Sequence, residues 1–487
     1  MANGGIIGTV NNPTSSTATG VWQQEEQYEA VRDGTWPERP LFTTKSLRFN
    51  DGSSDKLTRT QSNGNRQKFT LSTWLKRSAL NTTSPNIIKA GANDGTRNML
   101  RFEGTNQLRF YGVDASVGSG ASIDIKTNRV FTDPSAWYHI VVAVDTTQGT
   151  ASNRIKIYVN GVQETSFASN TIPNQNTNTQ FNLNGIVMAI GASSFGSSEY
   201  FDGYMSEVIN VDGTQLAPTS FGVANSDGVW TPIIYTGTFG NNGFNLQFEN
   251  AAALGTDSSP NGNTFTVSNL TSIDQSTDYP KNNFATLNPL IRTYGTQVFS
   301  NGNLTSLNAT NEPAWAHTLS SIGVSNGKWY WEIKVSGSTP WIWTGVISEA
   351  VDVRTQYLYN ENTGTFLYGN NGNKYLNGSA ASSFFATLAT NDIASVALDL
   401  DNNKITFYKN GTATPNATPL DLPANLSSTT VFPATTLVNG ASISINFGNA
   451  PYAISSGNAD GNGYGNFEYA VPSGYYSINT ANLAEFG

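Results

Sequence analysis

The chain has 487 residues, of which only 13% are charged and 11% are aromatic, with a formal net charge of −9. The scarcity of helix formers argues against a helical protein, and the aromatic content argues against disorder. The absence of cysteine excludes disulfides, thiol nucleophiles and Cys-ligated zinc. Without a basic stripe or an apolar run of about 20 residues, neither nucleic-acid binding nor membrane insertion is expected.

Residues 1–40 are predicted to form an N-terminal leader that anchors the chain. Residues 1–19 are mostly small and polar, which is typical of a flexible arm. Trp22, Tyr28 and Trp36 follow closely, and aromatic side chains so near a terminus need a surface to pack on. Two interpretations stay open: these rings pack on the first domain of the chain, or they dock onto a neighbouring subunit.

Residues 41–216 show the pattern of an antiparallel β-sandwich. Residues 69–75 largely alternate apolar and polar side chains, and residues 137–145 form a long apolar strand. Residues 154–159 alternate again and meet Asn160-Gly161, a strong hairpin signal because both turn positions favour positive φ. Strands about a dozen residues apart with no helix between them predict a sandwich.

Two further regions complete the chain. Residues 217–287 scatter aromatics among Gly, Asn and Ser, which predicts an irregular connector with short strands at 244–248 and 265–267, packed between the domains. Residues 288–487 are again rich in strands, and residues 396–411 repeat the strand, turn, strand and Asn-Gly pattern of the first half. The fold class is therefore all-β, with two tandem antiparallel β-sandwich domains of the jelly-roll type.

Both halves resemble known families of two-sheet β-sandwiches that are used mostly for binding. The first half, over about 46–212, resembles the laminin-G-like, concanavalin A-like jelly roll, and the second half, over about 290–450, resembles a SPRY domain. The segments that carry the first resemblance are 69–74, 137–140, 157–161 and 201–208, and those that carry the second are 328–333 and 403–411.

The order of the parts resembles structural proteins of tailed bacteriophages, particularly marine ones. Residues 20–37 resemble their N-terminal leader, and residues 254–259 with 280–289 resemble the junction before a SPRY-like domain. The resemblance implies a protein made in the host cytoplasm and displayed on the exterior of the virion. We expect other virion proteins as partners, a homotrimer, and host surface glycans or an envelope protein as the adhesion target.

No catalytic set emerges, so the protein is not expected to be an enzyme. A retaining glycosidase needs two carboxylates about 5 Å apart. Asp202 and Glu207 are the nearest pair in a family motif, but their spacing on a strand predicts opposite faces. The two histidines, His139 and His317, are far apart, and His139 is predicted to be packed in the sheet. No cofactor is expected, although calcium bound by loop oxygens stays open.

The strongest binding signal is Trp341-Ile342-Trp343. Both Trp side chains would point the same way from a strand, where they could stack on sugar rings or on a partner protein. The alternative is that both fill the sandwich core. Tyr357 and Tyr359 could line a neighbouring groove or seal the sheet.

Three functions are compared. The leading hypothesis is a tail or surface fibre component that displays lectin-like domains for adhesion to the host. The second is a capsid decoration or cementing protein with no receptor role. The third and least favoured is a glycan depolymerase.

Overall fold

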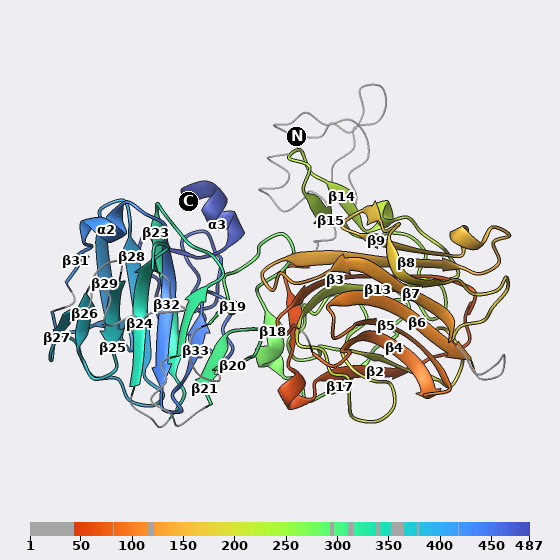
Figure 1. The fold of residues 1–487 in the computed structure, drawn as a ribbon, viewed down its shortest axis with the longest axis horizontal. Coiled ribbons are helices and arrows are strands. Elements are labelled where there is room, and N and C mark those ends of the chain that lie inside the picture. Colours follow the sequence, from red (N-terminus) through yellow and green to blue (C-terminus); the bar gives the residue numbers. More distant parts are fainter. Residues whose placement is uncertain are drawn as a thin grey trace, which may run out of the picture. The chain divides into compact units, whose positions relative to one another are not determined.

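The computed structural model describes residues 43–487 except 81, 115–120, 293–296, 310–315, 338–340, 352–364, 377–378 and 417. The described chain is nearly all β and forms two tandem antiparallel β-sandwiches, which confirms the predicted fold class (Figure 1). Residues 43–232 and 237–487, which hold both sandwiches, belong to one compact unit.

The first sandwich consists of two sheets, named here after β3 and β4. The β3 sheet contains β1 (Ser46–Phe49), β3 (Lys68–Arg77), β8 (Trp137–Asp145), β9 (Ile155–Val159), β10 (Val162–Gln163), β13 (Gly203–Asp212), β16 (Phe244–Leu246) and β18 (Gln275–Ser276). The β4 sheet contains β2 (Lys56–Thr60), β4 (Asn86–Asn93), β5 (Thr96–Phe102), β6 (Gln107–Asp114), β7 (Ala121–Val130), β11 (Phe167–Thr171), β12 (Val187–Ile190) and β17 (Thr266–Ser268). Leu, Ile, Val and Phe side chains of both sheets form one core between them.

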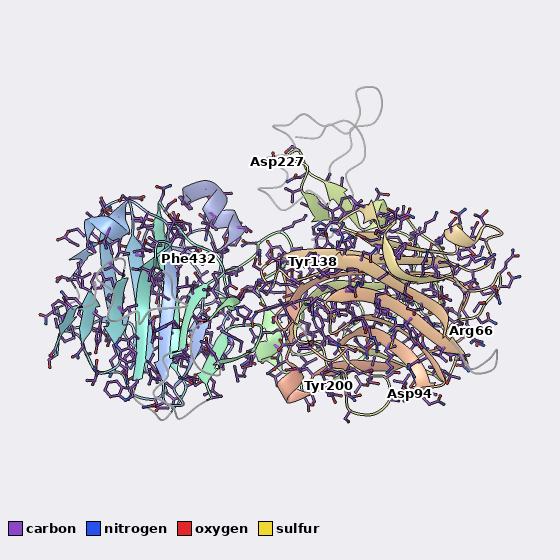
Figure 2. All side chains as sticks on the ribbon, in the orientation of Figure 1. Arg66, Asp94, Tyr138, Tyr200, Asp227 and Phe432 are labelled. Atoms are coloured by element: carbon purple, nitrogen blue, oxygen red, sulfur yellow. The ribbon has the colours of Figure 1, made fainter. Side chains whose placement is uncertain are left out.

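The second sandwich consists of a β23 sheet and a β24 sheet. The β23 sheet contains β20 (Gln297–Ser300), β21 (Thr305–Asn308), β23 (Lys328–Val335), β28 (Ile393–Asp399), β29 (Lys404–Lys409), β30 (Thr412–Ala413), β31 (Leu420–Asp421), β33 (Ser442–Asn446) and β34 (Tyr476–Ser477). The β24 sheet contains β19 (Leu287–Arg292), β22 (Ala316–Ser320), β24 (Trp341–Ser348), β25 (Thr365–Gly369), β26 (Lys374–Leu376), β27 (Ser379–Ala381) and β32 (Val431–Val438). Side chains fill the space between the sheets of each sandwich (Figure 2).

Short elements complete the chain. A hairpin of β14 (Gly222–Ala224) and β15 (Trp230–Pro232) lies between β13 and β16 in the chain, and helices α2 (Ala424–Ser427) and α3 (Thr480–Phe486) lie in the second half. Single 3-10 turns lie at η1 (Asp51–Ser53), η3 (Ala151–Asn153), η4 (Pro218–Ser220) and η5 (Ser272–Asp274).

The two sandwiches share one strand topology. The β3 sheet runs β10-β9-β8-β3-β13-β1 and then β18, and the β23 sheet runs β30-β29-β28-β23-β33-β21 and then β20, so the first six strands of the two sheets take corresponding places. The same holds for β2-β12-β4-β5-β6-β7 and β22-β32-β24-β25-β26-β27, whereas the edge strands β17 and β18 come late in the first sandwich and β19 and β20 come first in the second. The related architecture predicted from the repeated pattern is therefore present along the sheets.

The two Asn-Gly turns show the same correspondence in detail. Gly161 and Gly411 have φ of +80° and +76°, as the tight turn requires. A Cβ on Gly161 would lie 2.6 Å from the ring of Trp230, and one on Gly411 would lie 2.5 Å from the ring of Tyr469. In each sandwich an aromatic ring from a later segment thus packs directly on the turn glycine.

Much of the segment 217–287 belongs to the first sandwich rather than to a separate connector, although Ala285 and Leu287 already join the core of the second. Its short strands form close to the predicted positions, as β16 and β17, but β16 pairs with β13, β17 with β2 and β18 with β1. Phe244, Leu254 and Phe265 join the core of that sandwich. The physical reason is that these scattered apolar side chains bury most surface by extending existing sheets.

Candidate functional site

Trp341 presents an exposed aromatic ring on the face of the β24 sheet that points away from the main core. Along β24, Ile342 and Val346 belong to the main core, whereas Trp343 and Ile347 belong to a second apolar cluster on the opposite face. Trp341 is 40% exposed, and its ring stacks on Trp343 with centroids 5.9 Å apart and an interplanar angle of 14°. The prediction that both Trp side chains point the same way is confirmed in the structure.

Trp343 supports this ring but is not itself accessible. It is 2% exposed, and the Tyr375 ring meets it edge-on with centroids 5.7 Å apart. Phe432, labelled in Figure 2, packs half-buried against the same cluster. Because Trp341 and Tyr375 cover the ring of Trp343, this residue supports the Trp341 ring and is not itself the ligand contact that was predicted. We call Trp341, Trp343 and Tyr375 the Trp341 platform.

The other predicted site residues lie outside the described part of the chain. Tyr357 and Tyr359 fall within 352–364, and Trp22, Tyr28 and Trp36 fall within 1–42. The neighbouring aromatics Phe366 and Tyr368 are buried in the main core of the second sandwich.

The two weighed carboxylates, Asp202 and Glu207, are both buried. Asp202 precedes β13, and Glu207 lies in a bulge with φ of +49°, so the simple alternation that predicted opposite faces does not apply between them. Burial raises the pKa of the Glu207 carboxyl to about 7 and the pKa of Asp202 well above its usual value. The Gln247 amide donates to Glu207 at 2.9 Å.

His139 is a buried residue of β8, as predicted. Its Nδ1 accepts a hydrogen bond from Trp230 Nε1 at 2.9 Å, which leaves the ring proton on Nε2, 2.9 Å from Ser72 Oγ. The ring also stacks on Trp74 with centroids 4.7 Å apart. Burial lowers the pKa of His139 to about 3, so the imidazole is neutral and fastens the β14–β15 hairpin to the β3 sheet.

Among the residues that the structure describes, no group of three or more His, Asp or Glu side chains has the arrangement of a metal site. No helix in the described ranges is both long and apolar enough to cross a membrane.

Comparison with known families agrees with both halves of the fold. Residues 51–213 match the family described as the concanavalin A-like lectin/glucanases superfamily, in its laminin-G form. Residues 328–450 match the SPRY domain family. The chain therefore contains a laminin-G-like, concanavalin A-like domain and a SPRY domain, and these two domains fit a binding or adhesion role.

Solved structures similar to part of the chain include SPRY domains. The SPRY domain of human HERC1 is 19% identical, and the match covers 33% of this chain and 96% of that chain with a TM-score of 0.28. Stonustoxin is 18% identical over 33% of this chain and 27% of its own, also with a TM-score of 0.28. A human SPRY domain is 15% identical over 33% of this chain and 99% of its own, with a TM-score of 0.26.

Proposed function

We propose that this protein is a tailed-phage virion protein, a tail or surface fibre component that displays a concanavalin A-like domain and a SPRY domain for adhesion to the host surface. The two matched domains support the binding role, and the leader and junction sequences support the virion origin. The proposal includes a homotrimer on the particle exterior, contacts with other virion proteins, and no enzymatic activity or required cofactor.

The Trp341 platform is the observation that carries the adhesive part of the proposal. Trp341 is 40% exposed, and the stack on Trp343 covers one face of its ring and favours one orientation of it. A ring held in place loses little conformational entropy when a sugar or an apolar side chain stacks on it. Such a ring can therefore act as a binding anchor.

Replacing Trp341 with alanine is expected to weaken binding to host cells by about tenfold, which corresponds to about 1.4 kcal/mol. The free energy of unfolding should fall by only about 0.5–1.5 kcal/mol, the usual contribution of an aromatic pair, since the side chain is partly exposed. Biolayer interferometry on immobilised host envelopes measures the binding affinity, and thermal unfolding measures the stability. Val162→Ala, an exposed apolar residue of β10 in the other sandwich, is the control. Equal binding by Trp341→Ala and the unaltered protein would remove the platform from the proposal.

The anchoring part of the proposal is tested on particles. Deleting residues 1–40 is expected to abolish incorporation into virions while leaving both sandwiches folded, as measured by immunogold labelling and mass spectrometry of purified particles. Unchanged incorporation would show that another part of the chain makes the attachment.

The same experiments separate the alternatives. Normal incorporation of the full chain, together with no signal on glycan arrays and on host cells, would favour a decoration or cementing protein. Release of reducing sugar from host polysaccharide would favour a depolymerase.

A further inference from the structure

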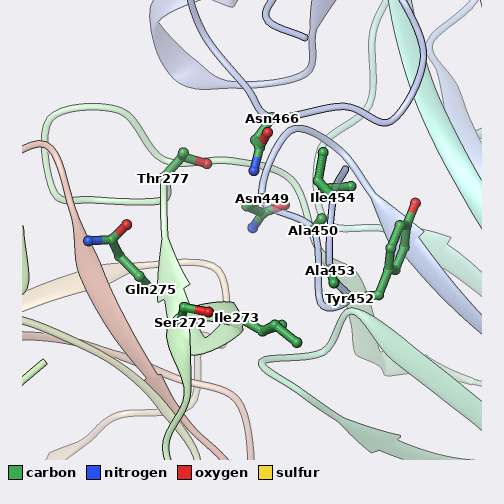
Figure 3. Close-up of a pocket in the computed structure, with 10 residues that line it drawn as sticks. All are labelled: Ser272, Ile273, Gln275, Thr277, Asn449, Ala450, Tyr452, Ala453, Ile454 and Asn466. Atoms are coloured by element: carbon green, nitrogen blue, oxygen red, sulfur yellow. The ribbon is translucent and has the colours of Figure 1, made fainter. Parts of the chain in front are cut away.

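A cavity of about 180 Å³ lies between two segments that are far apart in the sequence. One wall is the stretch from Ser272 to Thr277, which includes β18, and the other begins at Asn449, in the loop after β33. Figure 3 shows Asn449 in the middle of the group, with Asn466 beside it and the strand that carries Gln275 and Thr277 opposite. All of the side chains that line the cavity are uncharged.

Hydrogen bonds join the two walls, so the cavity has a defined shape. The buried guanidinium of Arg48 donates to the Ile273 carbonyl at 2.8 Å on one wall and to the Ala450 carbonyl at 3.3 Å on the other. Thr277 Oγ1 donates to the carbonyl of Gly448 at 2.7 Å and forms a second connection. A site whose walls are fixed before binding loses little conformational entropy when a ligand binds.

Asn449 is the unusual residue of this cavity. Its side chain is 2% exposed, yet neither its amide nitrogen nor its amide oxygen has a hydrogen-bond partner among the described residues. Asn446, three residues earlier, shows the ordinary arrangement: its nitrogen donates to Glu332 Oε2 at 3.2 Å and its oxygen accepts from the Gly448 N–H at 2.8 Å. A buried amide without partners destabilises a fold and therefore needs an explanation, and one explanation is a partner that the chain itself does not supply.

We infer that this cavity binds one neutral sugar unit, with Asn449 as the residue that recognises it. A carboxamide offers a donor and an acceptor side by side, which matches two neighbouring hydroxyl groups of a sugar. Ala450 and Ile454 offer apolar contacts to the C–H groups of the ring. The volume of about 180 Å³ lies below the roughly 300–1,000 Å³ of pockets for drug-sized ligands, which suits a single monosaccharide rather than a longer glycan. None of the lining side chains offers a counter-charge to an ionic ligand, and the nearby Arg48 guanidinium already donates to the carbonyls of both walls.

The inference goes beyond the proposed adhesion through Trp341. Ser272–Thr277 lies between the two ranges that match known families, and Asn466 lies beyond the second, so neither family match contains the whole cavity. A sugar bound here would contact both walls at once.

The test uses the full-length protein and saturation-transfer NMR with glucose, galactose, mannose and N-acetylglucosamine, each as the free sugar and as its methyl glycoside. We expect a signal from at least one of these sugars. The glycosides distinguish a site for a free monosaccharide from a site for the end unit of a glycan, because only the second kind of site accepts a substituent at the anomeric oxygen. Absence of signal from every sugar would overturn the inference.

Three variants test whether Asn449 is the residue that binds the sugar. Asn449→Leu is expected to lower the affinity at least tenfold while the Tm stays level or rises, since an unpartnered amide is replaced by an apolar group of similar size. Ala453→Phe, on the exposed rim, should block the cavity without touching Asn449. Asn446→Leu is the matched control and should lower the Tm by roughly 2–6 °C, because it leaves its partners unpaired.

The remaining outcomes are also decisive. Unchanged sugar affinity in both Asn449→Leu and Ala453→Phe would place the sugar elsewhere and overturn the assignment. A fall in Tm for Asn449→Leu as large as that for Asn446→Leu would assign Asn449 a structural role instead. Trp341→Ala should keep the sugar signal. If that variant loses host binding while no protein gives a sugar signal, the adhesion proposal stands and the assignment of a sugar site to the cavity is rejected.

Discussion

Replacing Asp278 with alanine is expected to lower the free energy of unfolding by about 3–5 kcal/mol. Its carboxylate Oδ2 lies 2.7 Å from Lys76 Nζ, and the two side chains are 0% and 1% exposed, respectively. The alanine variant would leave the Lys76 ammonium buried without its counter-charge. Removing one partner of a buried pair is costly because the desolvation of the remaining charge is no longer compensated.

The surroundings of this pair explain why it is held so firmly. Lys76 on β3 also donates to Asn283 Oδ1 at 2.8 Å and to the Phe284 carbonyl at 3.3 Å. Trp137 Nε1 donates to the second oxygen of Asp278 at 2.9 Å. The pair therefore fastens the end of the segment 217–287 to two central strands of the β3 sheet.

Urea denaturation of the full-length protein measures this effect. Asp421→Ala is the control, because the Lys404–Asp421 pair is 37% and 85% exposed and should contribute at most about 0.5 kcal/mol. The double variant Lys76→Met with Asp278→Leu should recover much of the loss, since it removes both charges together. A loss below about 1 kcal/mol for Asp278→Ala would contradict the burial of the pair.

Acid should destabilise the first sandwich through His139. The imidazole of an unfolded chain has a pKa of 6.5, whereas burial lowers the pKa of folded His139 to about 3. Between these two values only the unfolded chain binds the proton, so the stability present above pH 6.5 is lost as the pH falls towards 3. The contribution is about 1.4 kcal/mol per pH unit and reaches roughly 4–5 kcal/mol near pH 3.

Hydrogen exchange measured by mass spectrometry can follow this loss locally in β3 and β8. In the unaltered protein, protection of residues 68–77 and 137–145 should fall steadily from pH 6.5 to pH 4, after correction for the intrinsic exchange rate. His139→Gln, which does not titrate, should be less stable at pH 8 but should show a shallower pH dependence. Identical pH slopes in the two proteins would show that His139 is not the titrating group. Burial also lowers the pKa of His317, in the second sandwich, to about 3. Because His317 is present in both proteins, the loss of protection around it should be the same in both and serves as an internal reference.

Local sequence patterns were sufficient for most of the fold. The alternation in residues 154–159 and the Asn160-Gly161 turn predicted β9 and its hairpin because strand period and turn geometry depend on neighbouring residues. The same argument applied to the second half and predicted the shared architecture. It also predicted that Trp341 and Trp343 share a side, since side chains two residues apart on a strand point the same way.

Long-range packing decided the rest. The sequence by itself determined where most strands lie, their tight turns and the alternation of their faces, because these depend on near neighbours along the chain. Only the tertiary structure decided that Trp343 is covered while Trp341 is exposed, since that depends on Tyr375 from another strand. It also decided that β16, β17 and β18 complete the sheets of the first sandwich, and that Asn449 faces a cavity opposite Ser272–Thr277. No local pattern encodes such contacts, because the free energy of burial depends on which distant surfaces meet.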